Sequence, residues 1–222
     1  MRGDHRSFSK SMIERELRKD QKEGVPFEHY EAEFRKTVPE EAASRCGVSY
    51  ADGVFELTFL YERYRVTWPD FSITSDDPEA IGLTNLPCQT QILRFLTRGK
   101  KAAASAEWKS FRELPWGEVY ITQFTGRCIT RAAYSFGTRT DAFRKACEKM
   151  NAVPGTHGDC SYIFDLIGNY QIQLIIYEGD DEFPPSSQIL FSGNFSEGFE
   201  PEDRVVACDI LITTLKKMMA GL

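Results

Sequence analysis

The fold class is decided by one stretch, Tyr162-Ile-Phe-Asp-Leu-Ile-Gly168-Asn169-Tyr-Gln-Ile-Gln-Leu-Ile-Ile176. Every second position is apolar on either side of its centre, at Tyr162, Phe164 and Leu166 and again at Ile172, Leu174 and Ile176. A period of two residues is typical of a β-strand with one buried face. Because Gly-Asn between two such strands forms a tight turn, the stretch predicts an antiparallel hairpin.

A second alternating pattern lies upstream of this hairpin. Its apolar positions are Phe55, Leu57 and Phe59, followed by Tyr64, Val66 and Trp68. The pattern predicts another hairpin, which Pro69 ends because proline cannot donate to a strand ladder. We expect the hairpin within residues 48–74 to pair with the hairpin within residues 160–177.

Elsewhere, apolar residues recur at helical spacing. Proline or threonine marks the start of several of these segments, and glycine marks the end of several. The predicted helices cover residues 9–23, 26–37, 39–47, 87–97, 118–136 and 140–150, and a last helix starts at Pro201. Residues 100–117 show neither period, so we expect a packed loop there. Hairpins separated by helices predict an α+β fold, an antiparallel sheet with helices packed mainly on one face. We expect a helical N-terminal extension over residues 1–47 and a single α+β domain over residues 48–222.

Length and composition are those of a water-soluble protein. The chain has 222 residues, of which 41% are hydrophobic, and no window approaches the roughly 18 apolar residues that a membrane span needs. The N-terminus lacks the apolar core of a secretory signal, so we expect a cytoplasmic protein that does not bind membranes. Six cysteines occur without a Cys-x-x-Cys pair, which argues against a cysteine-ligated zinc ribbon or Fe–S cluster and favours buried reduced thiols.

The net charge of -6 is unevenly distributed along the chain. Residues 150–203 contain 10 acidic residues and neither Lys nor Arg, whereas residues 94–112 are basic. A net-acidic chain of this kind is a poor ligand for nucleic acid, because phosphate contacts dominate such binding. We therefore expect a small ligand or a protein as the partner, and leave open whether the acidic 177–183 and basic 94–112 stretches face each other.

The sequence lacks the common catalytic signatures. It contains neither a phosphate-binding loop, nor a dinucleotide-binding glycine motif, nor a zinc-protease helix motif, nor a nucleophile elbow. Of the three histidines, only His157 lies beside an acid in a glycine-rich loop that enters a strand. Whether the protein is an enzyme stays open at this point.

The acidic candidates follow the second strand of the 160–177 hairpin. Asp180, Asp181 and Glu182, with Asp159 and His157 from the preceding loop, could hold a hard metal ion or a cationic ligand. Adjacent residues of a strand point to opposite faces, so at most two of the three neighbouring acids could reach one ion. The alternatives are a solvated turn that discourages edge-to-edge strand pairing, and a surface that binds a partner.

The basic candidates form a second set. Arg94, Arg98, Lys100 and Lys101 could hold a phosphate or carboxylate, with aromatic walls from Trp108 and Trp116. The alternative for the cations is solvated charge at a helix end, where the macrodipole favours it. For the tryptophans the alternative is an anchor in the core or in a loop.

Several motifs together resemble a known family. They are Leu86-Pro87, Ile92–Leu96, Glu107–Pro115, Gly158-Asp159, Gly179–Phe191 and Glu202-Asp203. Over roughly residues 45–220 the chain resembles an uncharacterised prokaryotic family, domain of unknown function 3786, which is common in anaerobes. The resemblance implies no particular reaction. Some relatives carry an Fe–S domain of the kind seen in corrinoid proteins, but the first 45 residues here contain no cysteine, so such a partner would act in trans.

Three functional hypotheses follow. The first is an accessory protein that binds a small ligand, metal or cofactor of unknown identity, with a weak link to corrinoid or Fe–S metabolism through the resemblance. Its pocket would be bordered by residues 177–183 and 155–159. The second is a metal-assisted hydrolase that uses the same acids. The third is a protein–protein interaction module.

Overall fold

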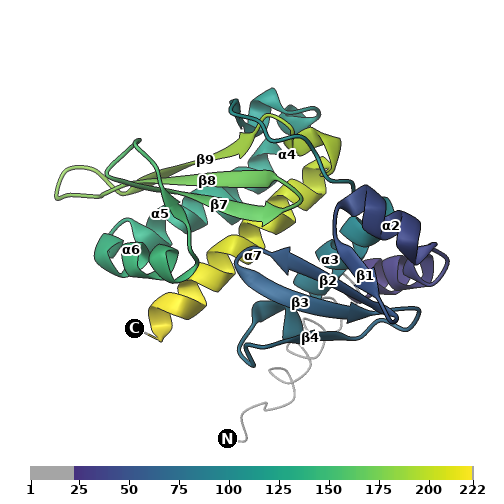
Figure 1. Ribbon diagram of the computed structural model, residues 1–222. Helices are drawn as coiled ribbons and strands as arrows, with labels where there is room; N and C mark the ends of the chain where they lie inside the picture. The colour runs from purple at the N-terminus through teal and green to yellow at the C-terminus, as the bar shows by residue number, and fades with distance from the viewer. Residues whose placement is uncertain (1–22, 222) are drawn as a thin grey trace, which may run out of the picture.

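The structure is a computed structural model that describes residues 23–221. Figure 1 shows two antiparallel sheets with helices around them, which confirms the α+β class. The first sheet has the order β1 (Ser49–Ala51), β2 (Val54–Phe59), β3 (Glu62–Thr67) and β4 (Ile73–Ser75). The second has the order β5 (Trp108–Ser110), β9 (Ser186–Ser192), β8 (Tyr170–Tyr177), β7 (Cys160–Ile167) and β6 (Val153–Pro154).

The β7–β8 hairpin is confirmed. Its turn residues Gly168 and Asn169 have φ angles of 59° and 71°. Positive φ at both central residues defines the type I′ turn, whose twist matches that of the flanking strands. The register places Tyr162 opposite Leu174, and both side chains are buried.

The two predicted hairpins belong to separate sheets, which corrects the expectation that they pair. The sequence did not reveal two short strands that form sheet edges next to the hairpins. Strand β1 pairs with β2 at the edge of the first sheet, and β6 pairs with β7 at the edge of the second. The hairpins still touch, because the Leu60 N–H donates to the Leu166 carbonyl at 2.7 Å. This contact leaves a hollow between the sheets rather than a continuous ladder.

The helices agree with the sequence to within a few residues at most ends. Residues 23–34 are helical, and the named helices are α2 (Pro39–Cys46), α3 (Leu86–Arg98), α4 (Gly117–Phe124), the π-helical η3 (Thr125–Thr130), α5 (Arg131–Phe136), α6 (Thr140–Lys149) and α7 (Pro201–Ala220). Short 3-10 turns lie at η1 (Ile81–Leu83), η2 (Phe111–Glu113) and η4 (Phe195–Glu197). The helix predicted for residues 9–23 lies, except for its last residue, outside the described residues.

Helix α7 runs diagonally across the molecule and packs against α3, α4, η3, α5 and α6 (Figure 1). Its first turn is fixed by Pro201 and by a capping box, in which the Glu200 N–H donates to Asp203 Oδ2 at 2.8 Å. Its apolar stripe is buried, including Val205 and Leu211. The start of α7 therefore holds Asp203 in a defined place beside α3.

Residues 100–117 form more than the predicted loop. Strand β5 pairs with β9, and Phe111 begins η2. A strand of three residues is too short to produce a recognisable alternation, which is why the sequence did not predict it.

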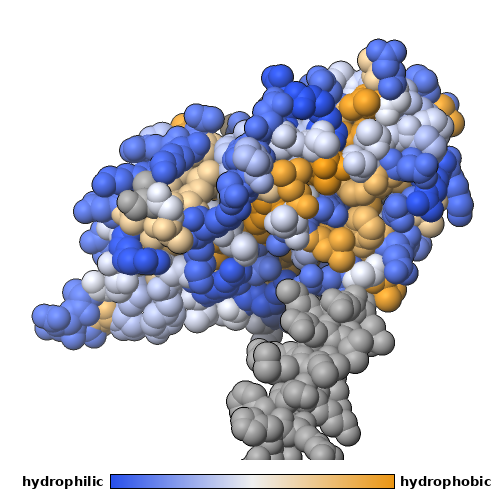
Figure 2. All heavy atoms as spheres, turned by 90° about the horizontal axis from the view of Figure 1, so that it is seen from below, coloured by the Kyte–Doolittle hydropathy of each residue, from blue (hydrophilic) through white to orange (hydrophobic). Residues whose placement is uncertain are grey.

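All six cysteines are buried and unpaired. No helix between residues 23 and 221 has both the length and the apolar character to cross a membrane. Seen from below, the surface carries a band of apolar residues bordered by charged ones (Figure 2).

Candidate functional site

The acidic run forms the turn between β8 and β9. Asp180 Oδ1 accepts the backbone N–H groups of Phe183 at 2.7 Å and Glu182 at 2.9 Å. These hydrogen bonds, first from Phe183 and then from Glu182, lower the pKa of the Asp180 carboxyl. Asp181 and Glu182 are exposed. The Asp180 carboxylate thus closes its own turn.

The 155–159 loop lies beside the first acid of this segment. Asp159 Oδ2 accepts the Glu178 N–H at 2.9 Å, and the Asp159 carbonyl accepts from Arg144 at 2.8 Å. The His157 ring faces Gln173 instead, with Nδ1 3.5 Å from its amide nitrogen. The structure brings Asp159 to Glu178 but shows no contact of His157 with the three neighbouring acids.

Within residues 23–221, no three His, Cys, Asp or Glu side chains are grouped so that they could hold a metal ion. The three cavities described for this part of the chain are lined by other residues. The acidic candidates therefore lie at the surface, outside these cavities.

The basic candidates are dispersed. Arg98 binds Glu33 through two hydrogen bonds of 2.9 and 2.7 Å, and Lys100 lies 2.9 Å from Glu197. Trp108 is half-buried in β5, whereas Trp116 is 73% exposed and precedes α4 with a φ of 62°. Arg94 and Lys101 line two different cavities.

Ion pairs join the basic 94–112 stretch to the acid-rich 150–203 stretch. Lys100 pairs with Glu197, and Arg94 pairs with Asp203. The 177–183 segment itself makes no ion pair with another described residue. The two opposite charge runs therefore meet at residues 197 and 203.

The largest of the three cavities, about 550 Å³, lies among the 23–34 helix, α3, η3 and α7; we name it the helix cavity. Its size is within the range of about 300–1,000 Å³ typical of small-molecule sites. Its walls are apolar at Val25, Pro26, Tyr30, Pro87 and Val206. They are charged or polar at Glu23, His29, Thr90, Gln91, Arg94, Arg127, Glu202, Asp203 and Asp209.

Arg94 is the most enclosed cation of the helix cavity. Its side chain is 20% exposed and forms an ion pair with Asp203, whose side chain is 7% exposed. The guanidinium lies 5.7 Å from the ring centroid of Tyr30, and burial lowers the pKa of Arg94. The 23–34 helix, α3 and α7 therefore meet at this side chain.

Among residues 23–221, the guanidinium of Arg94 forms an ion pair with Asp203 and no hydrogen bond to another residue. Arginine carries five N–H donors, and the ion pair with Asp203 uses the nitrogen Nη1. Every buried side-chain nitrogen or oxygen in the described residues has a hydrogen-bond partner. Arg94 lines the helix cavity, and its remaining N–H donors bond to no residue in the part of the chain that the structure describes.

Arg127 supplies a second cation from the π-helical segment η3. Its Nη2 lies 3.6 Å from Asp209 Oδ2, whereas Asp209 Oδ1 is bound by Arg131. Arg131 also donates to Thr213 at 2.9 Å. Asp209 is thus held more closely by Arg131, while Arg127, 39% exposed, lines the cavity and forms the longer pair with Asp209. Single π-helical turns inside α-helices occur frequently at functional sites.

Sequence reasoning identified Arg94 but not its surroundings. Glu202 and Asp203 have a sufficient role as first-turn helix acids, and Tyr30 belongs to the apolar face of a short helix. Arg127 stands in a segment predicted as ordinary helix. Motifs quoted for the family resemblance do meet here, since Pro87, Arg94, Glu202 and Asp203 all line the helix cavity.

The fold and the cavity define an α+β protein with a small-molecule-sized pocket between helices. The chain belongs to the family described as Domain of unknown function (DUF3786), whose model matches residues 38–214. The match includes both sheets and the α3, η3 and α7 walls of the cavity. No curated protein and no solved structure matches the chain.

Proposed function

We propose that this protein binds a small carboxylate ligand with an apolar body in the helix cavity. The observation that carries the proposal is the guanidinium of Arg94, four-fifths buried in the cavity wall with N–H donors beyond those that Asp203 uses. Charge-assisted hydrogen bonds to a carboxylate are among the strongest that a site can offer.

Four acids, Glu23, Glu202, Asp203 and Asp209, line the helix cavity beside Arg94 and Arg127, so the case for an anion depends on which carboxylates are already bound and not on net charge. Asp203 already accepts from Arg94 and from the Glu200 N–H, and Asp209 is already bound by Arg131. The carboxylates of Asp203 and Asp209 are therefore already bound, whereas Arg94 forms no hydrogen bond beyond its pair with Asp203 within residues 23–221. Glu202 is exposed at the rim, where solvent screens its charge.

The apolar walls favour a ligand that carries a hydrocarbon or aromatic body. Val25, Pro26, Pro87 and Val206 offer no hydrogen-bonding side chain, and the ring of Tyr30 forms a flat surface beside Arg94. Burial of apolar surface against these walls would add about 25 cal/mol for each Å² removed from water.

The test is a thermal-shift and calorimetric screen of aryl and acyl carboxylates, each paired with its uncharged carboxamide. We expect carboxylates of fitting size to raise the melting temperature and the matched amides to have much less effect. If no carboxylate binds, or if each amide binds as well as its acid, the proposal is wrong.

Two variants test whether the ligand binds in the helix cavity, and a third serves as a control. Val206→Phe should fill the cavity and abolish binding, whereas Val153→Phe, at a position 58% exposed in β6, should not affect it. Arg127→Met should weaken carboxylate binding about tenfold with little loss of stability, since Asp209 keeps Arg131. Unchanged affinity in both Val206→Phe and Arg127→Met would place the ligand elsewhere.

A further inference from the structure

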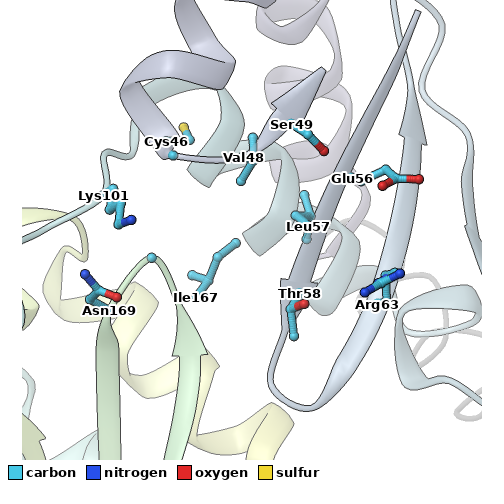
Figure 3. A pocket seen from close by; sticks show the side chains of 12 residues that line it. Cys46, Val48, Ser49, Glu56, Leu57, Thr58, Arg63, Lys101, Ile167 and Asn169 are labelled. Carbon is cyan, nitrogen blue, oxygen red and sulfur yellow. The ribbon is translucent and has the colours of Figure 1, made fainter. Parts of the chain in front are cut away.

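A second cavity, of about 420 Å³, lies where the two sheets meet; we name it the junction cavity. Figure 3 shows its walls: the end of α2 and the start of β1 on one side, β2 and β3 on another, and the β7–β8 turn opposite them. All of its lining residues lie inside the family match, and none of them lines the helix cavity.

The segment that follows α3 helps to build this cavity by linking α2 to the β7–β8 turn. The Lys101 N–H donates to the Arg45 carbonyl at 2.9 Å, and the Ala102 N–H donates to the Gly168 carbonyl at 3.1 Å. The stem of Lys101 packs on Gly47, where a Cβ atom would lie 2.5 Å from Lys101 Cδ. Gly47 also has a φ of 66°, so glycine is favoured there on two grounds. The amine of Lys101 is thereby placed at the cavity wall.

Two cations from different parts of the fold lie on opposite walls. Lys101 lies beside the β7–β8 turn, and Arg63 lies on β3 at the other side of the lining (Figure 3). Neither has a carboxylate within 4.0 Å among the described residues, whereas the neighbouring Lys100 pairs with Glu197. The one acid in the wall, Glu56, lies 3.7 Å from Arg65. The two cations therefore lack a counter-ion in this part of the chain.

The wall of the junction cavity presents more polar than apolar surface, because Leu57 and Ile167 are almost fully buried. Val48, Leu57 and Ile167 contribute hydrocarbon, and the hydroxyl of Thr58 stands on the strand directly opposite Arg63. A short anion could meet one cation at a time. A longer molecule with an anionic group at each end could meet both.

We propose that the junction cavity is a second binding site, which takes a small elongated dianion bridging Lys101 and Arg63. The shared chemistry is two oxyanion groups, which a dicarboxylate or a bisphosphate can supply. Such a ligand would connect the two sheets, since each cation stands on a different side of the junction. This site is independent of the carboxylate proposed for the helix cavity.

The test is calorimetric titration at low salt with pyrophosphate and with dicarboxylates of increasing chain length, each matched to the monocarboxylate of equal length. We expect one length of dianion to bind at least tenfold more tightly than its monoanion. Which series binds distinguishes a bisphosphate from a dicarboxylate. If no dianion exceeds its monoanion in either series, the proposal is overturned.

Three variants assign the site. Lys101→Met and Arg63→Met should each weaken dianion binding about tenfold, whereas Lys216→Met, which removes one exposed positive charge on α7, should not. Equal loss in all three variants would indicate attraction by net charge alone and would overturn the proposal. Val206→Phe should leave dianion binding intact, so failure of one site is distinguishable from failure of the other.

A bridging ligand also predicts a physical signature. Hydrogen exchange should slow at Leu60, which donates across the junction to Leu166, and at Ala102 when the dianion is bound. If the dianion slows hydrogen exchange on only one side of the junction, it does not bridge Lys101 and Arg63.

Discussion

Arg94 and Asp203 form a mostly buried ion pair that joins α3 to the first turn of α7 at the wall of the helix cavity. Asp203 Oδ2 also accepts the Glu200 N–H, so one carboxylate both caps α7 and binds α3. Because removal of one partner leaves the other charge partly buried and unpaired, the pair is more sensitive to mutation than a surface ion pair.

Arg94→Met should lower the free energy of unfolding by about 2–4 kcal/mol, because it strands the carboxylate of Asp203. The matched control is Arg98→Met, one turn further along α3, whose partner Glu33 and whose own side chain are 30% and 52% exposed. Loss of an exposed pair costs about 1 kcal/mol or less. Urea denaturation measures the free energy of unfolding of both variants. Equal losses would contradict the expectation that the more buried ion pair contributes more to stability.

The fold was predictable where a pattern was long enough to repeat. The β7–β8 hairpin has two strands of eight residues each and a turn whose residues require positive φ, so sequence alone specifies it. Strands β1, β5 and β6 have two or three residues each, too few to show a period. Strand β1 pairs with β2, and β6 pairs with β7. Without these two strands, the sequence led to the wrong expectation that the two hairpins pair with each other.

The candidate sites were predictable only residue by residue. Arg94 and Lys101 were selected as cations near a helix end, but sequence could not show that they line different cavities. Partners that decide their roles, Asp203 and Gly47, lie 109 and 54 residues away in the chain. Such tertiary contacts leave no trace in local composition or periodicity.

The carboxylate of Asp180 should organise the β8–β9 turn in a pH-dependent manner. Its folded pKa is lowered by hydrogen bonds from Phe183 and Glu182, so its contribution is present above its ordinary pKa and is lost as pH falls through the lowered value. Asp180→Ala should accelerate amide exchange at Phe183 above that pH. Asp181→Ala, which removes an exposed neighbour, should leave the exchange rate at Phe183 unchanged; an equal effect of both would refute this assignment.

The cysteines should be unreactive in the folded protein. All six are buried, and burial raises the pKa of the Cys46 thiol to about 11, so little thiolate forms at pH 8. A thiol-specific reagent should label none of them until denaturant is added, and then all six. Ser44→Cys, at an exposed position of α2, supplies a control that should react at once. Rapid labelling of a native cysteine without denaturant would show that the helices around it open more readily than their packing indicates.

Two glycines of the α4–η3 region should respond in opposite ways to alanine. A Cβ atom at Gly117 would collide with the Phe111 carbonyl, which is backbone and cannot rotate away, just after Trp116 adopts its left-handed conformation. Gly117→Ala should therefore cost about 1–3 kcal/mol of unfolding free energy. A Cβ at Gly126 would meet nothing within 4 Å, so Gly126→Ala should stabilise the helical segment by up to about 1 kcal/mol. Urea denaturation decides the matter, and a loss of stability in Gly126→Ala as large as that in Gly117→Ala would show that backbone flexibility in η3, rather than steric contact, limits the substitution.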